Sequence, residues 1–256
     1  MQPTVETLTE RDIAKAIDHS LLKPELDDVF IEDGCRLAAE YDVASVCVPP
    51  VHVRRAAAIL AGTDIKVGTV VGFPHGYATT ETKVAETRQA LAGGASEIDM
   101  VLQIGALKSG RDSDVQADIA AVVEVAHADG AIVKVIFENA YLSDDEKVRA
   151  CRLTEAAGAD FVKTSTGFAS GGATHDDLRL MRANTSPHVQ VKAAGGVRTL
   201  DALLEVMALG VTRIGATATA AIIDDFRART AGAQPLASAG RRDGGSGDGG
   251  SGDGGY

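Results

Sequence analysis

The chain has 256 residues, 45% hydrophobic and 24% charged, a composition that excludes a wholly disordered protein and suits one large domain or two small ones. Its 36 acidic residues outnumber its 25 basic residues and give a net charge of −11, which disfavours nucleic acid and anionic membrane surfaces as partners. An anionic substrate would therefore need backbone donors and a few placed cations in a local pocket.

The cysteines and the apolar segments indicate the compartment. Cys35, Cys47 and Cys151 are too few and too scattered for a disulfide framework, and they form no CxxC pair. The first residues carry no basic and apolar leader, and no apolar run approaches the roughly 18 residues of a membrane span. We expect a cytoplasmic protein that does not bind membranes.

Strand-like and helix-like segments alternate along the chain. Strands are expected at residues 16–21, 44–48, 65–73, 97–104, 132–137, 161–166, 189–194 and 213–217, which are short and β-rich. Between them, helical periodicity is found in segments such as 31–41, 80–92, 113–128, 144–157 and 200–209. Eight such units in about 230 residues favour an α/β fold, a single-domain (β/α)8 TIM barrel, with an open parallel sheet as the alternative.

The composition changes near the end of the chain. Residues 1–12 are expected to be an N-terminal extension, residues 13–229 the barrel, and residues 230–256 a flexible tail rich in Gly, Ser and Asp. The tail contains one GxGxxG match, but no strand precedes it and no helix follows it. We therefore do not interpret that match as a dinucleotide site.

Alternate residues of a barrel strand face the helices or the barrel axis, so each strand can be divided into two faces. In several strands the apolar residues all fall on one face, which leaves charged residues on the other. Because unpaired buried charge costs several kcal/mol per ion, the charged groups on the axis must pair, shift their pKa values or take part in chemistry. The side chains expected at the axis are Asp18, Cys47, Glu97, Asp99, Lys134, Glu138, Lys163, Gln190 and Lys192.

Two of these lysines fall on successive strands. Lys163 and Lys192 would lie on parallel strands about 4.8 Å apart, close enough for like charge to lower one ammonium pKa, as burial also does. A neutral lysine is a nucleophile that forms Schiff bases with carbonyl compounds, and Asp99 is placed to relay protons. For Lys134, Glu97 and Glu138 we favour ordinary ion pairs.

Cys47 is a second candidate nucleophile, but free cysteine is commonly buried, and we favour a role as a pocket residue. The six histidines form no ligand pattern such as HExxH, so we predict no metal site. Glycines follow the late strands, and Gly195-Gly196-Val197-Arg198 before a helix that begins near Thr199 suits the phosphate site usual in such barrels.

Seven ordered segments together resemble the deoxyribose-phosphate aldolase family: IDHSLLKP, SVCVPP, VVGFPHG, EIDMVLQIG, FVKTSTGF, VKAAGG and RIGAT. The resemblance covers residues 13–226. It implies a metal-independent class I aldolase, with no cofactor, that interconverts 2-deoxy-D-ribose 5-phosphate with D-glyceraldehyde 3-phosphate and acetaldehyde in deoxyribose phosphate catabolism. It also implies small phosphosugar and aldehyde substrates and a homodimer.

Carried over by motif, Lys163 is the Schiff-base lysine, Lys192 the lysine that tunes it, and Asp99 the proton relay. The resemblance further implies that Asp18 and Ser20 contact substrate hydroxyls. The residues that it places around the phosphate are Gly167, Gly195, Gly196, Val197, Arg198, Gly215 and Thr217.

The chain departs from the family pattern at three positions. Ser20 and Asn139 stand where threonine is usual, and Thr217-Ala218 replaces a serine pair, so one hydroxyl on the phosphate side is missing. The terminal Tyr256 is a candidate for proton transfer, because a Gly-rich tether of this length has an r.m.s. reach near 28 Å, with an incidental tyrosine as the alternative. Other readings are an aldolase for another phosphosugar and a non-catalytic phosphosugar sensor.

Overall fold

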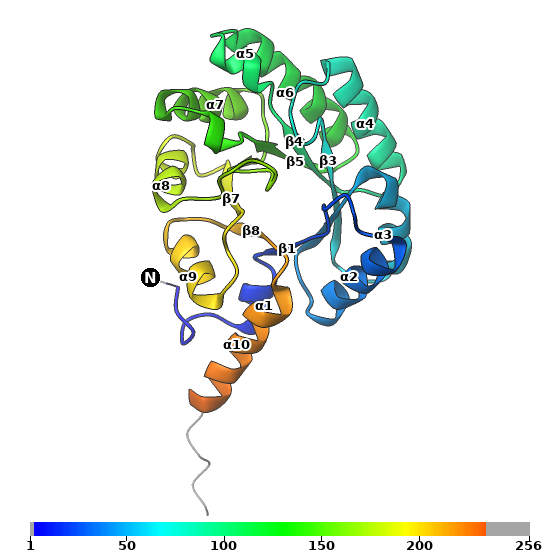
Figure 1. Ribbon diagram of the computed structural model, residues 1–256, viewed down its shortest axis with the longest axis vertical. Coiled ribbons are helices and arrows are strands. Elements are labelled where there is room, and N and C mark those ends of the chain that lie inside the picture. The colour runs from blue at the N-terminus through cyan, green and yellow to red at the C-terminus, as the bar shows by residue number, and fades with distance from the viewer. Residues whose placement is uncertain (1–2, 234–256) are drawn as a thin grey trace, which may run out of the picture.

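Eight parallel strands close into a barrel in chain order, with the last strand pairing with the first (Figure 1). The computed structural model describes residues 3–233. This closed order confirms the predicted (β/α)8 barrel and excludes the open sheet. The strands are β1 Ile17–Ser20, β2 Ser45–Val48, β3 Lys66–Val71, β4 Glu97–Val101, β5 Ile132–Ile136, β6 Phe161–Lys163, β7 Gln190–Ala194 and β8 Arg213–Ala216.

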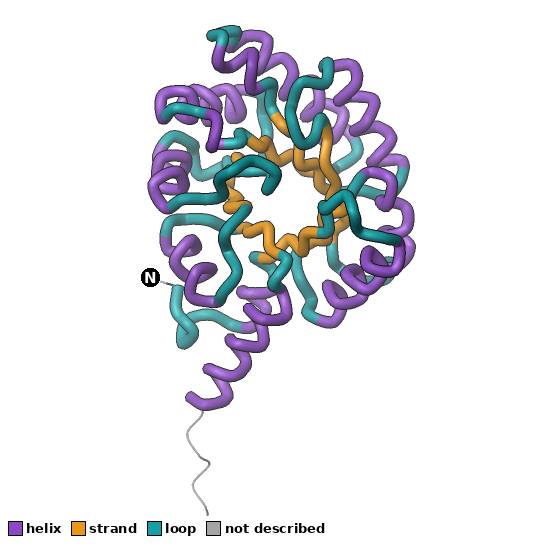
Figure 2. The backbone as a smooth tube through the Cα atoms, in the orientation of Figure 1, coloured by secondary structure: helices purple, strands orange, loops and turns teal. Residues whose placement is uncertain are grey.

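Helices surround this ring on all sides, and the loops at the carboxyl ends of the strands gather over one barrel mouth (Figure 2). The α-helices are α1 Glu10–Ala14, α2 Asp28–Glu40, α3 Val53–Ile59, α4 Thr80–Ala92, α5 Ile104–Lys108, α6 Asp112–Ala128, α7 Asp144–Ala156, α8 His175–Ala183, α9 Leu200–Ala208 and α10 Thr219–Ala233, and the short 3₁₀ turns are η1 Pro50–His52 and η2 Asn139–Tyr141. Within residues 3–233, no helix has both the length and the apolar character needed to cross a membrane.

The core lies between the barrel and its helices, and the strand faces divide as the alternation predicts. In β4, Ile98 and Met100 have no solvent exposure and belong to the apolar cluster, whereas Glu97 and Asp99 make ion pairs inside the barrel. Transfer of the apolar face from water, at about 25 cal/mol per Å², favours this orientation of the strand. The same apolar face therefore fixes which polar side chains reach the axis.

The predicted N-terminal extension and the predicted C-terminal tail each overlap a helix of the structure. Helix α1 begins at Glu10, inside the segment expected to be an extension, and Thr9 forms a capping box with Asp12 there. Helix α10 continues to Ala233, past the expected end of the barrel at residue 229. The rest of the predicted tail, including the GxGxxG match and Tyr256, lies outside the described residues.

Candidate active site

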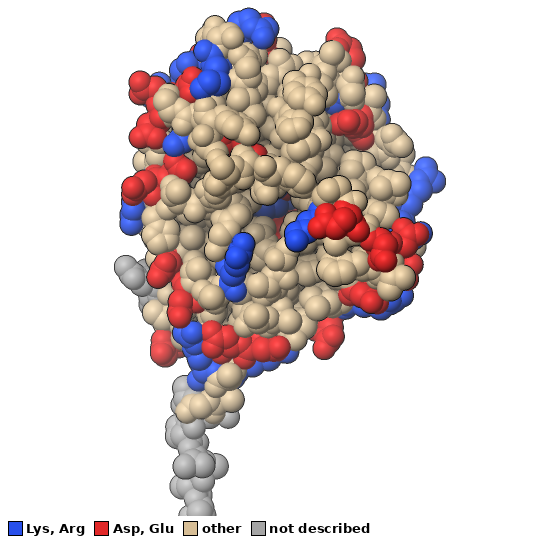
Figure 3. Space-filling model, in the orientation of Figure 1, with Lys and Arg blue, Asp and Glu red and all other residues tan. Residues whose placement is uncertain are grey.

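A cavity of about 460 Å³ opens at the carboxyl ends of the strands. Figure 3 shows this face of the molecule hollowed near its centre, with acidic and basic side chains around the opening. Twelve of the predicted site residues line the cavity: Asp18, Ser20, Cys47, Lys163, Gly167, Lys192, Gly195, Gly196, Val197, Arg198, Gly215 and Thr217. Asp99 does not line it, but hydrogen-bonds to two lysines that do.

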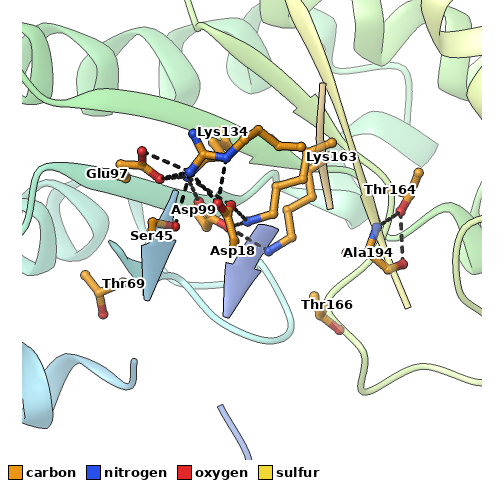
Figure 4. Close-up of polar contacts among 12 residues, drawn as sticks. Asp18, Ser45, Thr69, Glu97, Asp99, Lys134, Lys163, Thr164, Thr166 and Ala194 are labelled. Carbon is orange, nitrogen blue, oxygen red and sulfur yellow. Dashed lines mark hydrogen bonds and ion pairs between the residues drawn. The ribbon is translucent and has the colours of Figure 1, made fainter. Parts of the chain in front are cut away.

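Two lysines share one carboxylate at the cavity floor (Figure 4). Lys163 and Lys192 are paired in register on β6 and β7. Each Nζ donates a hydrogen bond of 2.7 Å to Oδ2 of Asp99, which comes from β4, separated from β6 by β5 alone. Lys163 is 3% exposed, Lys192 1% and Asp99 0%, so the three groups interact with little solvent screening.

The two amines have different proton affinities. Burial lowers the pKa of Lys163 below its ordinary value, and the Lys192 charge lowers it further, although Asp99 opposes both effects. Burial also disfavours the Lys192 ammonium, but Asp18 and Asp99 outweigh it and raise the pKa of Lys192. Of the two, Lys163 is therefore the amine that more readily becomes neutral and nucleophilic.

Ion pairs continue below these lysines toward the amino ends of the strands. Lys192 also contacts Asp18 Oδ2 at 2.5 Å, and Asp18 accepts a hydrogen bond of 2.7 Å from Arg213 Nε. Lys134 lies 2.6 Å from Glu97 Oε2 and 2.8 Å from Asp99 Oδ1. The ion pairs expected for Lys134 and Glu97 are confirmed.

Glu138 departs from its expected ion pair. It follows β5 with a left-handed backbone, φ 56°, and its buried carboxylate accepts hydrogen bonds from the backbone and the hydroxyl of Thr166. Gln190 also differs from expectation, because it is exposed at the amino end of β7 and accepts a hydrogen bond from Thr212. The alternation of side chains predicts which face of a strand a residue lies on, but it does not predict how far along the barrel axis that residue lies.

The glycine-rich loops on the other side of the cavity pack closely. Gly195 and Gly196 have φ values of 82° and 96°, a region that favours glycine, and a Cβ on Gly172 would lie 2.7 Å from the Gly195 carbonyl oxygen. Helix α9 follows, with Thr199 as its N-cap accepting from Ala202 N. This segment presents backbone N–H groups near a helix N-terminus, an arrangement that favours anions.

Several cavity residues were not singled out from the sequence. Leu22, Lys23 and Pro24 come from the loop after β1, and Thr166 and Phe168 from the loop after β6, which reaches over the barrel opening (Figure 1). All five lie within the segments IDHSLLKP and FVKTSTGF, so the resemblance to the aldolase family could have identified them as site residues. The other missed lining residues are Glu25, Ala194 and Ala216.

The remaining candidate nucleophile is less reactive than Lys163. Burial raises the pKa of the Cys47 thiol to about 11, which leaves the sulfur protonated near neutral pH. Among residues 3–233, no three His, Cys, Asp or Glu side chains come together in a way that could hold a metal ion. The nucleophile that the geometry favours is the Lys163 amine.

Fold and site together give a (β/α)8 barrel whose cavity is lined by a buried lysine of lowered pKa, an arrangement suited to Schiff-base chemistry. Comparison with known proteins narrows this class: residues 12–232 match the DeoC/LacD family aldolases. A deoxyribose-phosphate aldolase of Rhodopirellula baltica is 51% identical over 84% of this chain and 90% of its own length. Another, from Clostridium perfringens, is 50% identical over 85% of this chain and 96% of its own.

Solved structures agree with the sequence matches. An aldolase named QR15 aligns with a TM-score of 0.82 and 35% identity, covering 87% of this chain and 99% of its own. The tetrameric deoxyribose phosphate aldolase of Aeropyrum pernix aligns with a TM-score of 0.81 and 28% identity, covering 88% and 95%. The chain belongs to the DeoC/LacD aldolase family.

Proposed function

We propose that this chain is a class I aldolase that reversibly cleaves 2-deoxy-D-ribose 5-phosphate to D-glyceraldehyde 3-phosphate and acetaldehyde. The observation that carries the proposal is the Lys163 amine, which lines the cavity, is almost wholly buried and has a lowered pKa. The curated relatives are named deoxyribose-phosphate aldolases, which supports this substrate.

The first half of the reaction makes the Schiff base. The Lys163 nitrogen attacks C1 of the open-chain sugar phosphate, and loss of water from the carbinolamine leaves a positively charged iminium. Acetaldehyde takes C1 and C2, so the bond that breaks is C2–C3. As the C3 hydroxyl loses its proton, the C2–C3 electron pair moves toward the iminium nitrogen, which leaves an enamine and releases glyceraldehyde 3-phosphate.

The second half returns the protons. The enamine takes a proton at C2, and water then hydrolyses the iminium to acetaldehyde and the free lysine. Lys192 and Asp99 are the donor and acceptor pair nearest to the reacting nitrogen, because one Asp99 oxygen contacts both amines. We assign these proton transfers to them through water, and each such transfer contributes typically 10² to 10⁴ in rate.

The phosphate is assigned to the glycine-rich side of the cavity. Gly195, Gly196 and Val197 precede the α9 N-terminus, while Gly167, Gly215 and Thr217 lie on the neighbouring loops. Arg198 supplies a cation at the mouth. Asp18 and Ser20, from β1, are the residues we assign to the sugar hydroxyls, and Cys47 forms part of the wall.

The test is turnover by the full chain. Purified protein is given 2-deoxyribose 5-phosphate, and both products are measured by coupled oxidation or reduction of a nicotinamide. We expect both in equal amounts, and none with Lys163→Met. Consumption of a different phosphosugar would favour an aldolase of other specificity, and phosphosugar binding without turnover would favour the sensor. Either result would overturn the proposal. The homodimer, the cytoplasmic location and a role for Tyr256 stay predictions.

A further inference from the structure

Seven charged side chains form one buried cluster inside the barrel. Three are carboxylates, namely Asp18, Glu97 and Asp99, and four are basic, namely Lys134, Lys163, Lys192 and Arg213. Their side chains are at most 13% exposed. Charges this poorly screened influence one another strongly.

The cluster has contributions from almost every strand. Asp18 comes from β1, Glu97 and Asp99 from β4, and the four basic groups one each from β5, β6, β7 and β8. Strand β2 adds the Cys47 thiol and the Ser45 hydroxyl, and Ser45 accepts a hydrogen bond of 3.2 Å from Arg213. Strand β3 places Gly68 and Val70 beside them, and its Lys66 is exposed at the amino end.

The charges balance in only one simple way. With three carboxylates ionised, three of the four basic groups are needed for neutrality. Arg213 stays charged in proteins, Lys134 sits between Glu97 and Asp99, and Lys192 sits between Asp18 and Asp99. Among residues 3–233, Lys163 has one carboxylate partner, Asp99, and Lys192 contacts the same Asp99 oxygen. The basic group left over is Lys163.

Arg213 reaches Lys163 only through other members of the cluster. One route runs from Arg213 to Asp18, Lys192 and Asp99. The other runs from Arg213 to Glu97 at 2.8 Å, and then to Lys134 and Asp99. By neutralising Asp18 and Glu97, Arg213 keeps those carboxylates from attracting a proton to the lysines.

We propose that Arg213 and Glu97, at the amino end of the barrel, are positioning residues that set the charge of the Lys163 amine through the balance of the buried cluster. Neither lines the cavity, so neither is assigned to substrate contact. The inference rests on the proposed Schiff-base function, because it concerns the amine that performs it.

The proposal predicts opposite effects from two neighbouring substitutions. Arg213→Met leaves the cluster with one excess negative charge, which favours the Lys163 ammonium and shifts its titration to higher pH. Glu97→Gln leaves one excess positive charge, which shifts the titration to lower pH. Removing one charge from the buried cluster is expected to shift the titration of Lys163 by about one pH unit, because the remaining charges are close and poorly screened. The double variant restores neutrality and returns the titration toward the wild-type position.

The experiment measures how fast acetaldehyde and cyanoborohydride alkylate Lys163 as a function of pH, with the modified peptide identified by mass spectrometry. Arg213→Lys keeps the charge and is expected to titrate as the wild type does. Arg229→Met removes an arginine from an exposed ion pair with Asp201 and serves as the matched control. Thermal unfolding of each variant shows that it folds.

The proposal is supported if Arg213→Met and Glu97→Gln shift the rate profile in opposite directions and the double variant falls between them. The proposal is overturned if both single variants leave the pH profile of the rate unchanged, or if both shift it in the same direction. If Arg213→Met does not fold, Glu97→Gln and the double variant decide, and an unmoved Glu97→Gln profile overturns the proposal. Absence of a Lys163 adduct in the wild type would instead contradict the proposed function.

Discussion

Lys163 and Lys192 lie opposite each other on neighbouring strands, and both amines donate to the same oxygen of Asp99 at 2.7 Å. Two ammonium groups held this close in a buried site repel each other, so the protein favours the state in which one of them is neutral. Asp18 provides Lys192 with a second carboxylate. This asymmetry supports the proposal that Lys192 carries the charge and that Lys163 is the nucleophile.

Lys192→Met removes the charge that disfavours the Lys163 ammonium, so the pKa of Lys163 is expected to rise. At neutral pH, kcat/KM is expected to fall by at least about 100-fold, because less amine is neutral and a proton-transfer partner is lost. Part of the loss is expected to be recovered at alkaline pH. The pH profile of kcat/KM checks this, with Lys192→Arg as the variant that keeps the charge. A profile parallel to that of the wild type would contradict the assigned role of Lys192.

Arg198→Ala tests the phosphate site, since Arg198 is a cation at the cavity mouth beside the glycine-rich loop. The KM for 2-deoxyribose 5-phosphate is expected to rise about tenfold, equivalent to about 1.4 kcal/mol, with little change in kcat. The KM for 2-deoxyribose, which has no phosphate, is expected to stay constant. Arg111→Ala changes an arginine at a separate cavity and is the control. Equal effects on both substrates would argue against phosphate contact.

His19 is predicted to make stability depend on pH. Burial lowers its pKa to about 4, and its Nδ1 lies 2.8 Å from the Thr219 hydroxyl. The unfolded chain binds this proton near pH 6.5, so as pH falls from there toward 4 only the unfolded state gains a proton. The folded state is expected to lose about 3 kcal/mol over that range.

Denaturant unfolding at a series of pH values measures this effect. His19→Asn is expected to flatten the decline between pH 6.5 and about 4, whereas the exposed His188→Asn is expected to keep it. An identical decline in the wild type and in His19→Asn would show that other groups cause it.

Much of the barrel interior could be predicted because a strand has a period of two. Once Ile98 and Met100 were assigned to the helix-facing side of β4, Glu97 and Asp99 had to face the axis, and the same reasoning placed Lys163 and Lys192. The sequence predicted that Asp99 faces the axis, but it did not predict contact with both lysines, because the distances between strands across the barrel depend on how the barrel closes.

Other features depend on depth or on loop conformation, which alternation does not describe. The expected ion pair of Glu138 was wrong because the chain leaves β5 at Ile136 and turns left-handed at Glu138, so its carboxylate meets Thr166 instead. Arg213 was not singled out, although it stands at the start of a predicted strand. Its long side chain reaches Asp18 and Glu97 from there, a contact that only the three-dimensional register reveals.

The most direct test of the account is the site of the acetaldehyde adduct. Wild-type protein is incubated with acetaldehyde and borohydride at neutral pH, and the intact mass and the peptide masses are measured. We predict one ethyl group on each chain, on Lys163, and none on Lys192 or Lys134. No adduct, or an adduct on another lysine while Lys163 stays unmodified, would contradict the claim that Lys163 is the nucleophile.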